Sequence, residues 1–353
     1  MAPWNSSLPF YFTEARVKKL HWEFAVHSIQ GAVLLTTNAI ILLAILKHRP
    51  LRRRKEYIII AGLALVDSIT GAGALTGGVG RNIIMSLHLQ NSTVSRWQCF
   101  LRPWNMLFIF KAHTNGLMLC VVSLDRLLAT AKPFLYMRLT KTYAVRMLIG
   151  VLAHGLVPLL AIGVLSFLDQ TGPIFSATCY SVTVLHDWVY HNFTEPLLCT
   201  VSVGIYVLVL ILYLVRNPAR GLSTAGHARR IKHQRRITVT IAITCVVTVV
   251  FEIFPRVLIV LSKMMGGRSK LKAFGSIIYF IRSKQYAIRN LNPLANILIY
   301  SLRHQEIRTG IRYLFCCRRM NETELKRLKS SHVPSADPLL STSRNTASAT
   351  HLT

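Results

Sequence analysis

The sequence predicts an all-α membrane protein, a bundle of seven transmembrane helices followed by a short amphipathic helix. The first observation is composition, because the 353 residues are 52% hydrophobic and only 16% charged, which is too apolar for an ordinary soluble protein. The second is spacing, because apolar stretches long enough to cross the ~30 Å hydrocarbon core of a bilayer recur seven times. They lie at about 24–46, 57–80, 102–130, 143–167, 193–215, 237–262 and 273–300.

Basic residues are concentrated in the short connections on one side of the predicted bundle. The formal net charge is +29, and Lys and Arg gather in the segments 47–56, 131–142 and 216–236. By the positive-inside rule these connections are cytoplasmic and the N-terminus is outside, as expected for a multi-pass protein of the plasma membrane. Charges clustered between apolar spans are not the footprint of a nucleic-acid-binding protein. We therefore expect membrane lipid, and no nucleic acid, among the partners.

The chain divides into four predicted segments, two of which carry candidate modification sites. A glycosylation sequon begins at Asn5, in the polar N-terminal segment. Cys316 and Cys317 directly follow a stripe of apolar residues at helical spacing, a typical position for palmitoylation beside the inner leaflet. The segments are an extracellular tail at 1–22, the transmembrane domain at 23–301, the amphipathic inner-leaflet helix at 302–317 and a disordered cytoplasmic tail at 318–353.

The third apolar span has two chemically different ends. It lies within the stretch from Cys99 to Pro133, with Asp125-Arg126 at the end predicted to be cytoplasmic. Cys179, in the polar connection after the fourth span, is predicted to be extracellular like Cys99. An oxidising exterior lets these two cysteines form a disulfide that holds the connection over the helix ends, and two free thiols are the alternative.

A cluster of polar side chains is predicted in the membrane interior, where such groups are costly and therefore suggest function. Asp67 lies midway along the second span, and amides of the first, third and seventh spans lie at comparable depth. The cluster can hold a sodium ion, or it can be a hydrogen-bonded network without an ion. Lys111 precedes Asn115 by one helical turn and would compete with sodium for Asp67. The predicted members are Asn38, Asp67, Lys111, Asn115, Asn292 and Asn296, and no cofactor other than sodium is expected.

Several motifs together resemble those of the rhodopsin-like G-protein-coupled receptors. They are LALVD at 63–67, DRL at 125–127 and NILIY at 296–300. Within that family, the LRRRK, WQCF and DRLLA segments are most similar to nematode serpentine chemoreceptors of the srsx type. The resemblance implies a receptor, not an enzyme, which transmits an extracellular chemical signal to a heterotrimeric G protein by outward motion of the sixth helix about Pro255. It implies G-protein coupling at Asp125, Arg126, Arg235 and Tyr300.

The chain departs from the pattern of that family at several positions. Leu127 stands where the usual motif has a tyrosine, and Pro293 lies one helical turn before its usual place. Glu252-Ile253-Phe254 occupies the region where the family usually has a tryptophan switch. Cys99 also stands two residues farther from the third-helix acid than is usual.

The predicted inner end of the sixth span carries no acid. In this family an acid there holds the arginine of the third helix in the inactive state, whereas residues 229–236 read RRIKHQRR. Arg126 would be repelled by Arg235. We therefore expect a weakened inactive state and some ligand-independent signalling.

The class of ligand is predicted from the residues expected to face the outer cavity. Phe108 stands where amine receptors have an acid, and Arg289-Asn290 stands where opsins have the retinal lysine, so neither a monoamine nor retinal is expected. An aromatic lining with two guanidinium groups suits an acidic small molecule or a peptide C-terminus. The alternative is that each arginine snorkels or pairs with Glu252. The expected lining is Trp104, Phe108, His113, Phe254, Arg256, Tyr279, Tyr286 and Arg289.

Two other classes of protein were weighed against a receptor. A transporter or ligand-gated channel would have broken helices, and the glycines between Gly71 and Gly80 could break the second span. A membrane hydrolase could use His186, Asp187 and His191 as metal ligands. No fourth ligand is evident for such a site, so no metal centre is predicted.

Overall fold

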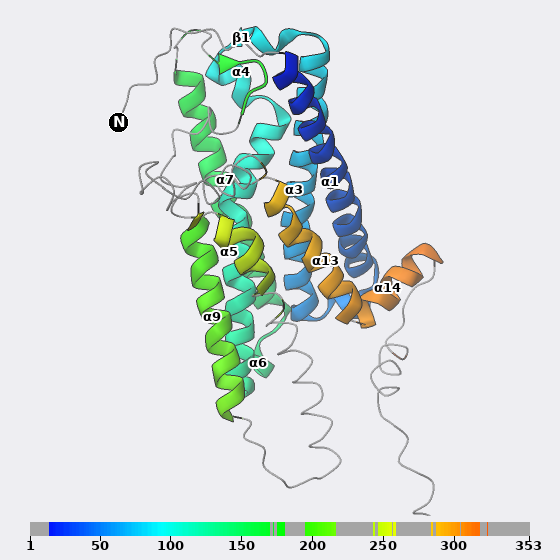
Figure 1. Cartoon of the computed structure of the whole chain (residues 1–353). Helices are drawn as coiled ribbons and strands as arrows, with labels where there is room; N and C mark the ends of the chain where they lie inside the picture. The colour runs from blue at the N-terminus through cyan, green and yellow to red at the C-terminus, as the bar shows by residue number, and fades with distance from the viewer. Residues whose placement is uncertain are drawn as a thin grey trace, which may run out of the picture.

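Five long helices run side by side and form the body of the molecule (Figure 1). The computed structural model describes residues 14–169, 172, 175–180, 195–216, 243, 246–255, 257–258, 284, 287–303, 305–317 and 323. Within these residues, five helices are long and apolar enough to cross a membrane. They are α1 (Glu14–Lys47), α3 (Lys55–Ser86), α5 (Pro103–Ala131), α7 (Lys141–Leu168) and α9 (Glu195–Arg216).

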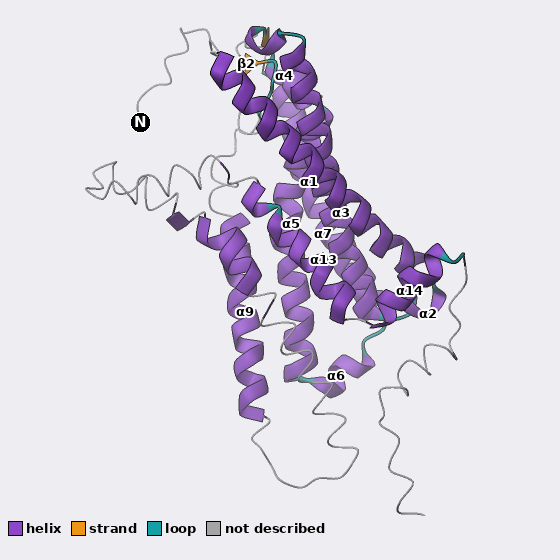
Figure 2. Cartoon of the chain, turned by 45° about the vertical axis from the view of Figure 1, so that its right-hand side comes forward, coloured by secondary structure: helices purple, strands orange, loops and turns teal. Residues whose placement is uncertain are grey.

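Short elements close the two ends of the bundle. One end, called the disulfide end below, carries the 3₁₀ helix η1 (Leu89–Asn91), α4 (Arg96–Phe100) and an antiparallel pair of strands, β1 (Thr93–Val94) and β2 (Phe175–Ser176). The opposite end, called the α6 end, carries α2 (Arg49–Arg52), α6 (Pro133–Arg138) and α14 (Gln305–Phe315). Figures 1 and 2 show α14 leaving the bundle sideways at this end. The long helices and α14 confirm the predicted all-α membrane fold.

The sixth and seventh predicted spans lie largely outside the described residues. A π-helical turn, η3 (Val249–Ile253), ends just before Phe254 and Pro255 of the sixth span. Proline and π turns are both recognised causes of helix kinks, so this is where a bend is expected. The described part of the seventh span is α13 (Leu291–Arg303).

The first helix begins earlier than predicted. α1 starts at Glu14, so the last nine residues of the predicted tail at 1–22 are helical. An apolar window locates only the membrane-crossing part of a helix, whereas a helix can continue into water through polar turns. Glu14 in the first turn favours this extension, because a carboxylate is stabilised at a helix N-terminus.

Cys99 does not lie on the third transmembrane helix, as the sequence suggested, but on the separate helix α4. That helix ends at Phe100, and α5 begins at Pro103, which occupies its first turn. Proline is favoured at the first position of a helix and breaks a helix interior, so the chain turns at Leu101 and Arg102. This turn separates Cys99 from the helix that carries Asp125.

The glycines of the second span do not break it, because α3 is one continuous helix. They allow close approach of neighbouring helices instead. A Cβ atom added to Gly71 would lie 2.5 Å from the backbone nitrogen of Leu35, and one added to Gly31 would lie 2.3 Å from that of Leu75. The interpretation of α3 as a broken transporter helix is therefore wrong.

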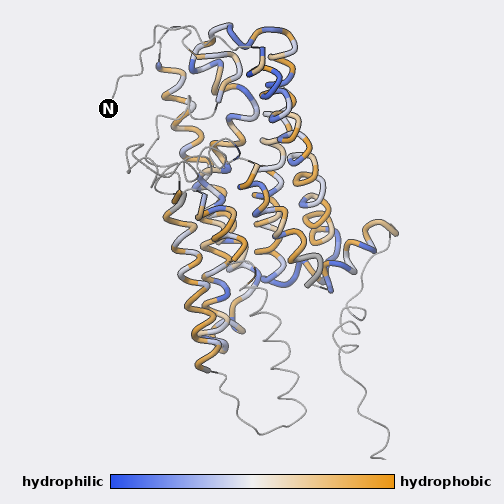
Figure 3. Tube along the Cα trace, in the orientation of Figure 1, coloured by the Kyte–Doolittle hydropathy of each residue, from blue (hydrophilic) through white to orange (hydrophobic). Residues whose placement is uncertain are grey.

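The apolar core lies where α3, α5, α7 and α9 meet. Leu63 of α3, Met118 of α5, Val151 of α7 and Tyr206 of α9 are buried members of one cluster. The outward faces of α7 and α9 expose large aliphatic side chains, and hydrophilic segments gather in the connections at both ends (Figure 3). This distribution is that of a bundle surrounded by lipid.

Candidate functional site

Four charged residues, two acids and two bases, lie within the helix bundle. Asp67 of α3 is buried, and the charges of Lys111 on α5 and Glu252 on η3 act on its carboxylate. Glu252 is also buried, and its Oε1 atom accepts hydrogen bonds from Nε and Nη2 of Arg289 at 3.1 and 3.0 Å. A buried charge is costly unless it is paired, and Glu252 and Arg289 offset one another's charge here. Glu252 and Arg289 link η3 to the residues just before α13.

The amides predicted around Asp67 are buried, and their hydrogen bonds run in different directions. Asn38 donates to a carbonyl of its own helix one turn earlier at 3.0 Å. The Oδ1 atom of Asn292 accepts from the hydroxyl of Thr248 at 3.4 Å. The buried Oδ1 atom of Asn296 has no hydrogen-bond partner among the described residues. An oxygen in this state fits a water or a cation beside it.

The three predicted ligand residues of α5 face different neighbours. The ring of Trp104 lies against Gly80, and Phe108 packs against α3 one turn further along. His113 is buried instead towards α7, with its ring centroid 6.4 Å from that of His154. Its Nδ1 atom is 2.8 Å from a backbone carbonyl of its own helix. Trp104 and Phe108 therefore lie on the side of α5 that faces α3, whereas His113 lies on the side that faces α7.

The other predicted ligand residues are only partly described. Phe254 is 53% exposed, whereas Pro255 beside it is buried. Arg289 is engaged by Glu252, which is the alternative considered for the arginines. Arg256, Tyr279 and Tyr286 lie outside the described residues.

The residues weighed for a metal centre also lie outside that part of the chain. These are His186, Asp187 and His191. Within the described ranges, no group of three or more His, Cys, Asp or Glu side chains could hold a metal ion.

At the disulfide end, the connection containing β2 is held by a disulfide and by hydrogen bonds from two side chains. Cys99 and Cys179 form the predicted disulfide. The buried side chain of Arg81 on α3 donates from Nε to the Thr178 carbonyl and from Nη2 to the Cys179 carbonyl, both at 3.1 Å. Trp104 donates from Nε1 to the same Cys179 carbonyl at 3.2 Å. Arg81 was not predicted from the sequence. The feature that could have indicated it is a single arginine at the outer end of an apolar span.

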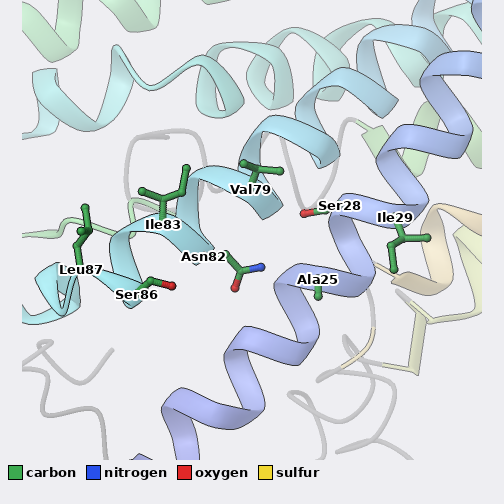
Figure 4. Close-up of a pocket in the computed structure, with 8 residues that line it drawn as sticks. All are labelled: Ala25, Ser28, Ile29, Val79, Asn82, Ile83, Ser86 and Leu87. Atoms are coloured by element: carbon green, nitrogen blue, oxygen red, sulfur yellow. The ribbon is translucent and has the colours of Figure 1, made fainter.

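A shallow groove of about 490 Å³ lies between α1 and α3 near the disulfide end (Figure 4). Its lining is mostly apolar, and none of the predicted ligand residues belongs to it. Ile29 and Ile83 on its rim are exposed, so the groove opens sideways from the bundle. Asn82 lies between the two helices and hydrogen-bonds Nδ1 of His21 at 3.0 Å. The groove is distinct from the predicted interior pocket.

Asp125 and Arg126 lie at the α6 end of α5. The carboxylate of Asp125 is fully buried, and its Oδ2 atom is 3.5 Å from Nη2 of Arg126. The same Oδ2 atom accepts a hydrogen bond from the hydroxyl of Tyr136 on α6 at 3.2 Å. Burial raises the pKa of the Tyr136 phenol, so this hydroxyl stays protonated and donates. Leu127 stands where the usual motif has a tyrosine. Tyr136, eleven residues after Asp125, hydrogen-bonds the acid of this motif instead.

Lys55, the first residue of α3, holds α6 in place. Its ammonium group donates to the carbonyls of Tyr136 and of Leu139, the latter at 3.0 Å, and lies 3.7 Å from the centroid of the Tyr136 ring. These carbonyls belong to the last turn of α6 and the residue after it, where carbonyl groups lack partners within the helix. A cation is disfavoured at the N-terminus of α3 but favoured at the C-terminus of α6. Lys55 and Tyr136 are functional candidates that the sequence analysis missed.

The outer face of α6 is apolar and exposed. Phe134 is 79% exposed and Met137 is 70% exposed, both within one turn of the residues that contact Asp125. Large exposed apolar side chains in a patch mark interaction surfaces. Two other coupling residues were predicted. Tyr300 lies in α13, but its side chain is outside the described part of the structure. Arg235 lies wholly outside the described residues.

The amphipathic helix α14 packs on the end of α1. Ile307 is fully buried, and Nε2 of His48 is 2.9 Å from the carbonyl oxygen of Gly310. Cys316 and Cys317, which follow the helix, have free and exposed thiols. The predicted amphipathic helix is confirmed, and the two cysteines are accessible for modification.

The arrangement agrees with a comparison of the chain with known families. Residues 32–315 match the model of the serpentine-type seven-transmembrane G-protein-coupled chemoreceptors Srsx. A comparison with curated proteins gave no match. The matched region includes the interior charges, the disulfide and the group formed by Asp125, Arg126 and Tyr136, called the Arg126 cluster below. The family is a class of receptors rather than of enzymes. The chain therefore belongs to the Srsx family of serpentine seven-transmembrane chemoreceptors.

Proposed function

We propose that this receptor lies in the plasma membrane with its N-terminus outside and activates a heterotrimeric G protein at the α6 end. The observation that carries the proposal is the combination of Arg126, held by the buried Asp125, with the exposed apolar face of α6 beside it. A charged group with an adjacent apolar patch at one end of the bundle is suited to a protein partner. The basic connections 47–56 and 131–142, which the positive-inside rule assigns to the cytoplasm, lie at this same end.

The ligand that we propose is an acidic small molecule or a peptide C-terminus. Glu252 and Arg289 connect η3 with the segment leading into α13, and η3 directly precedes the predicted hinge at Pro255. A ligand carboxylate that bound Arg289 would replace Glu252 and release this connection. The sixth helix could then swing outward about Pro255, which biases the bundle towards its active state.

A sodium ion is a second proposed ligand, near Asp67. The carboxylate of Asp67 and the amide oxygen of Asn296, which lacks a hydrogen-bond partner among the described residues, are oxygen ligands suited to such an ion. Lys111 would compete with the ion, because its charge already acts on Asp67. We expect sodium to leave signalling of the wild-type receptor unchanged and to reduce it in Lys111→Ala. An equal response of both proteins to sodium would contradict this competition.

Two modifications are proposed at the ends of the chain. The exposed thiols of Cys316 and Cys317 would carry lipid, which would hold α14 on the inner leaflet. Asn5, which lies outside the described residues, would carry a glycan on the extracellular side. Hydroxylamine-sensitive acyl labelling that is lost in Cys316→Ser/Cys317→Ser, and a mass shift on glycosidase treatment that is lost in Asn5→Gln, would test these sites.

The proposed function is tested by measuring G-protein activation in membranes from cells that express the receptor. The panel contains acidic odorants, short peptides with free C-terminal carboxylates and the amidated form of each peptide. We expect activation by some carboxylates, no activation by the amidated forms and loss of both basal and stimulated activity in Arg126→Ala. Arg52→Ala, which removes an exposed arginine at the same end, is the matched control and should retain activity.

Three results would each contradict part of the proposal. If Arg126→Ala signals like the wild type at equal surface expression, coupling does not depend on the Arg126 cluster. If amidated and free peptides activate equally, the ligand is not recognised through a carboxylate. Basal activity equal to that of cells without the receptor would contradict the predicted weak inactive state.

A further inference from the structure

A second groove lies at the α6 end, where α6 is joined to α7. It has a volume of about 410 Å³, within the range of small-molecule sites. Two arginines line it, Arg138 at the end of α6 and Arg146 in the second turn of α7, together with the hydroxyl groups of Thr140, Thr142 and Tyr143. The polar side chains of the lining are thus hydrogen-bond donors, and two of them carry positive charge.

No acid of the described structure neutralises this groove. Neither Arg138 nor Arg146 forms an ion pair within the residues that the structure describes, and Asp125 is already engaged by Tyr136 and Arg126. Among the described residues, the positive charge of the groove is therefore uncompensated and favours an anion.

The first turn of α7 adds to this attraction. Thr140 precedes the helix and makes no capping hydrogen bond with its side chain. The amide groups of the first turn of a long helix are directed towards its N-terminus and favour an anion there.

The surface beyond the groove is apolar. Thr142, Arg146, Ile149 and Val157 follow one another along one face of α7 at helical spacing. Ile149 and Val157 are exposed. This face thus passes from polar to basic to apolar, as expected where a helix crosses from headgroups into hydrocarbon. A ligand with both a phosphate and acyl chains matches it better than a soluble anion does.

We propose that the groove between α6 and α7 binds the phosphate of an anionic phospholipid, whose acyl chains lie along the exposed apolar face of α7. The two guanidinium groups are suited to hydrogen-bond phosphate oxygens in pairs. This site rests on the proposed orientation, in which the α6 end is cytoplasmic and faces the anionic leaflet. It does not depend on G-protein coupling.

Lipid at this site would also stabilise α6. Arg138 is the last residue of that helix, and the next residue, Leu139, offers its carbonyl to Lys55. A headgroup held between Arg138 and Arg146 would therefore join α6 to α7, as Lys55 joins it to α3. The lipid composition of the membrane would then influence the surface proposed for the G protein.

The test is lipid binding to the purified full-length receptor in detergent, followed by native mass spectrometry. Three probes separate the sources of affinity: phosphatidic acid, phosphatidylcholine with the same acyl chains, and soluble glycerol 3-phosphate. We expect phosphatidic acid to bind at least tenfold more tightly than either of the other two. Arg138→Gln/Arg146→Gln should weaken its binding by about tenfold, since each arginine near an anionic surface contributes on the order of a few-fold in affinity.

Matched variants make the outcome decisive. Arg49→Gln/Arg52→Gln removes the same charge from exposed residues of α2 at the same end and should change the affinity less than twofold. Arg138→Lys/Arg146→Lys should retain part of the affinity. Equal losses in the α2 and groove variants, no loss in the groove variant, or glycerol 3-phosphate binding as tightly as phosphatidic acid would each overturn the proposal. Because no G protein is present, failure here is separate from failure of the proposed coupling.

Discussion

The two ends of the bundle are held together by different kinds of bond. At the disulfide end, a covalent bond and the side chains of Arg81 and Trp104 converge on the carbonyl groups of Thr178 and Cys179. These bonds fix the main chain by several independent routes, so that losing one leaves the others. The disulfide end is therefore built to keep one conformation.

The α6 end depends instead on side chains that can exchange partners. Tyr136 and Arg126 share one oxygen of Asp125, while the other oxygen, Oδ1, has no hydrogen-bond partner among the described residues. α6 is held to α3 by Lys55 alone among the contacts described above. In the proposed orientation, the fixed end is the extracellular end and the adjustable end meets the G protein. Four substitutions test this difference.

The largest loss of stability is expected from Cys99→Ser. The disulfide joins residues 80 positions apart, and opening a loop of that length releases chain entropy worth about 4 to 5 kcal/mol. Thermal unfolding of the purified receptor should show a much lower Tm for Cys99→Ser than for the wild type. Cys316→Ser, which removes an exposed free thiol, is the control. A reductant should lower the Tm of the wild type and of the control, but not that of Cys99→Ser.

A smaller loss, with a gain of basal signalling, is expected from Glu252→Gln. Removing one charge of a buried pair deprives Arg289 of the Glu252 carboxylate, at a cost of about 3 kcal/mol. If the pair restrains the sixth helix, basal G-protein activation should rise although stability falls. The exchanged pair Glu252→Arg/Arg289→Glu should recover part of both properties. A double variant as impaired as the sum of its single variants would show that Glu252 and Arg289 do not act as a pair.

Lys55→Met should loosen the α6 end and leave the disulfide end unchanged. The variant retains the apolar stem of a side chain that is only 8% exposed but loses charged hydrogen bonds worth about 1.5 to 3 kcal/mol each. Hydrogen exchange should accelerate in residues 133–138 and stay constant in residues 93–100. Lys47→Met, at an exposed position of the last turn of α1, should change neither segment. Faster exchange at both ends of Lys55→Met would mean that the ends are not independent.

The smallest effect is expected from Tyr136→Phe, which removes one hydrogen bond worth about 1 kcal/mol. The Tm should fall slightly, and the change should be confined to the α6 end. Burial raises the pKa of Tyr136 above the usual value of about 10, so the hydroxyl is lost as a donor only above that value. The difference in Tm between variant and wild type should therefore be constant from pH 7 to pH 9. A difference that disappears within this interval would contradict the buried hydrogen bond.

Local patterns in the sequence predict much of this fold. The bounds of α5, α7 and α9 were predicted to within two residues, because an apolar run is a property of the segment itself. The helix predicted at 302–317 is present as α14 (Gln305–Phe315), because its apolar stripe is visible at helical spacing. The early start of α1 was missed, because polar turns outside the membrane leave no hydropathy signal.

The site was predicted less completely, because its contacts join distant parts of the chain. Arg289 and Glu252 are 37 positions apart, and Lys55 and Tyr136 are 81 positions apart. The sequence left open whether Arg289 faces a ligand or pairs with Glu252, because a contact between helices depends on how the helices are arranged. The same limitation applies to Arg81, which binds carbonyls 97 and 98 positions away. Residue types indicated which side chains belong inside, but not which ones meet.

The turn at Leu101 and Arg102 has a consequence for comparing related sequences. It separates the disulfide-bonded helix α4 from Pro103, where α5 begins. Insertions and deletions at this turn leave the register of α5 intact, so that Lys111, Asn115 and Arg126 keep their places. Relatives are therefore best aligned without gaps from Pro103 to Arg126, with any change in length assigned to the turn. A cysteine that is displaced by a residue or two in a relative then reflects a different length of the turn and does not imply a different orientation of α5.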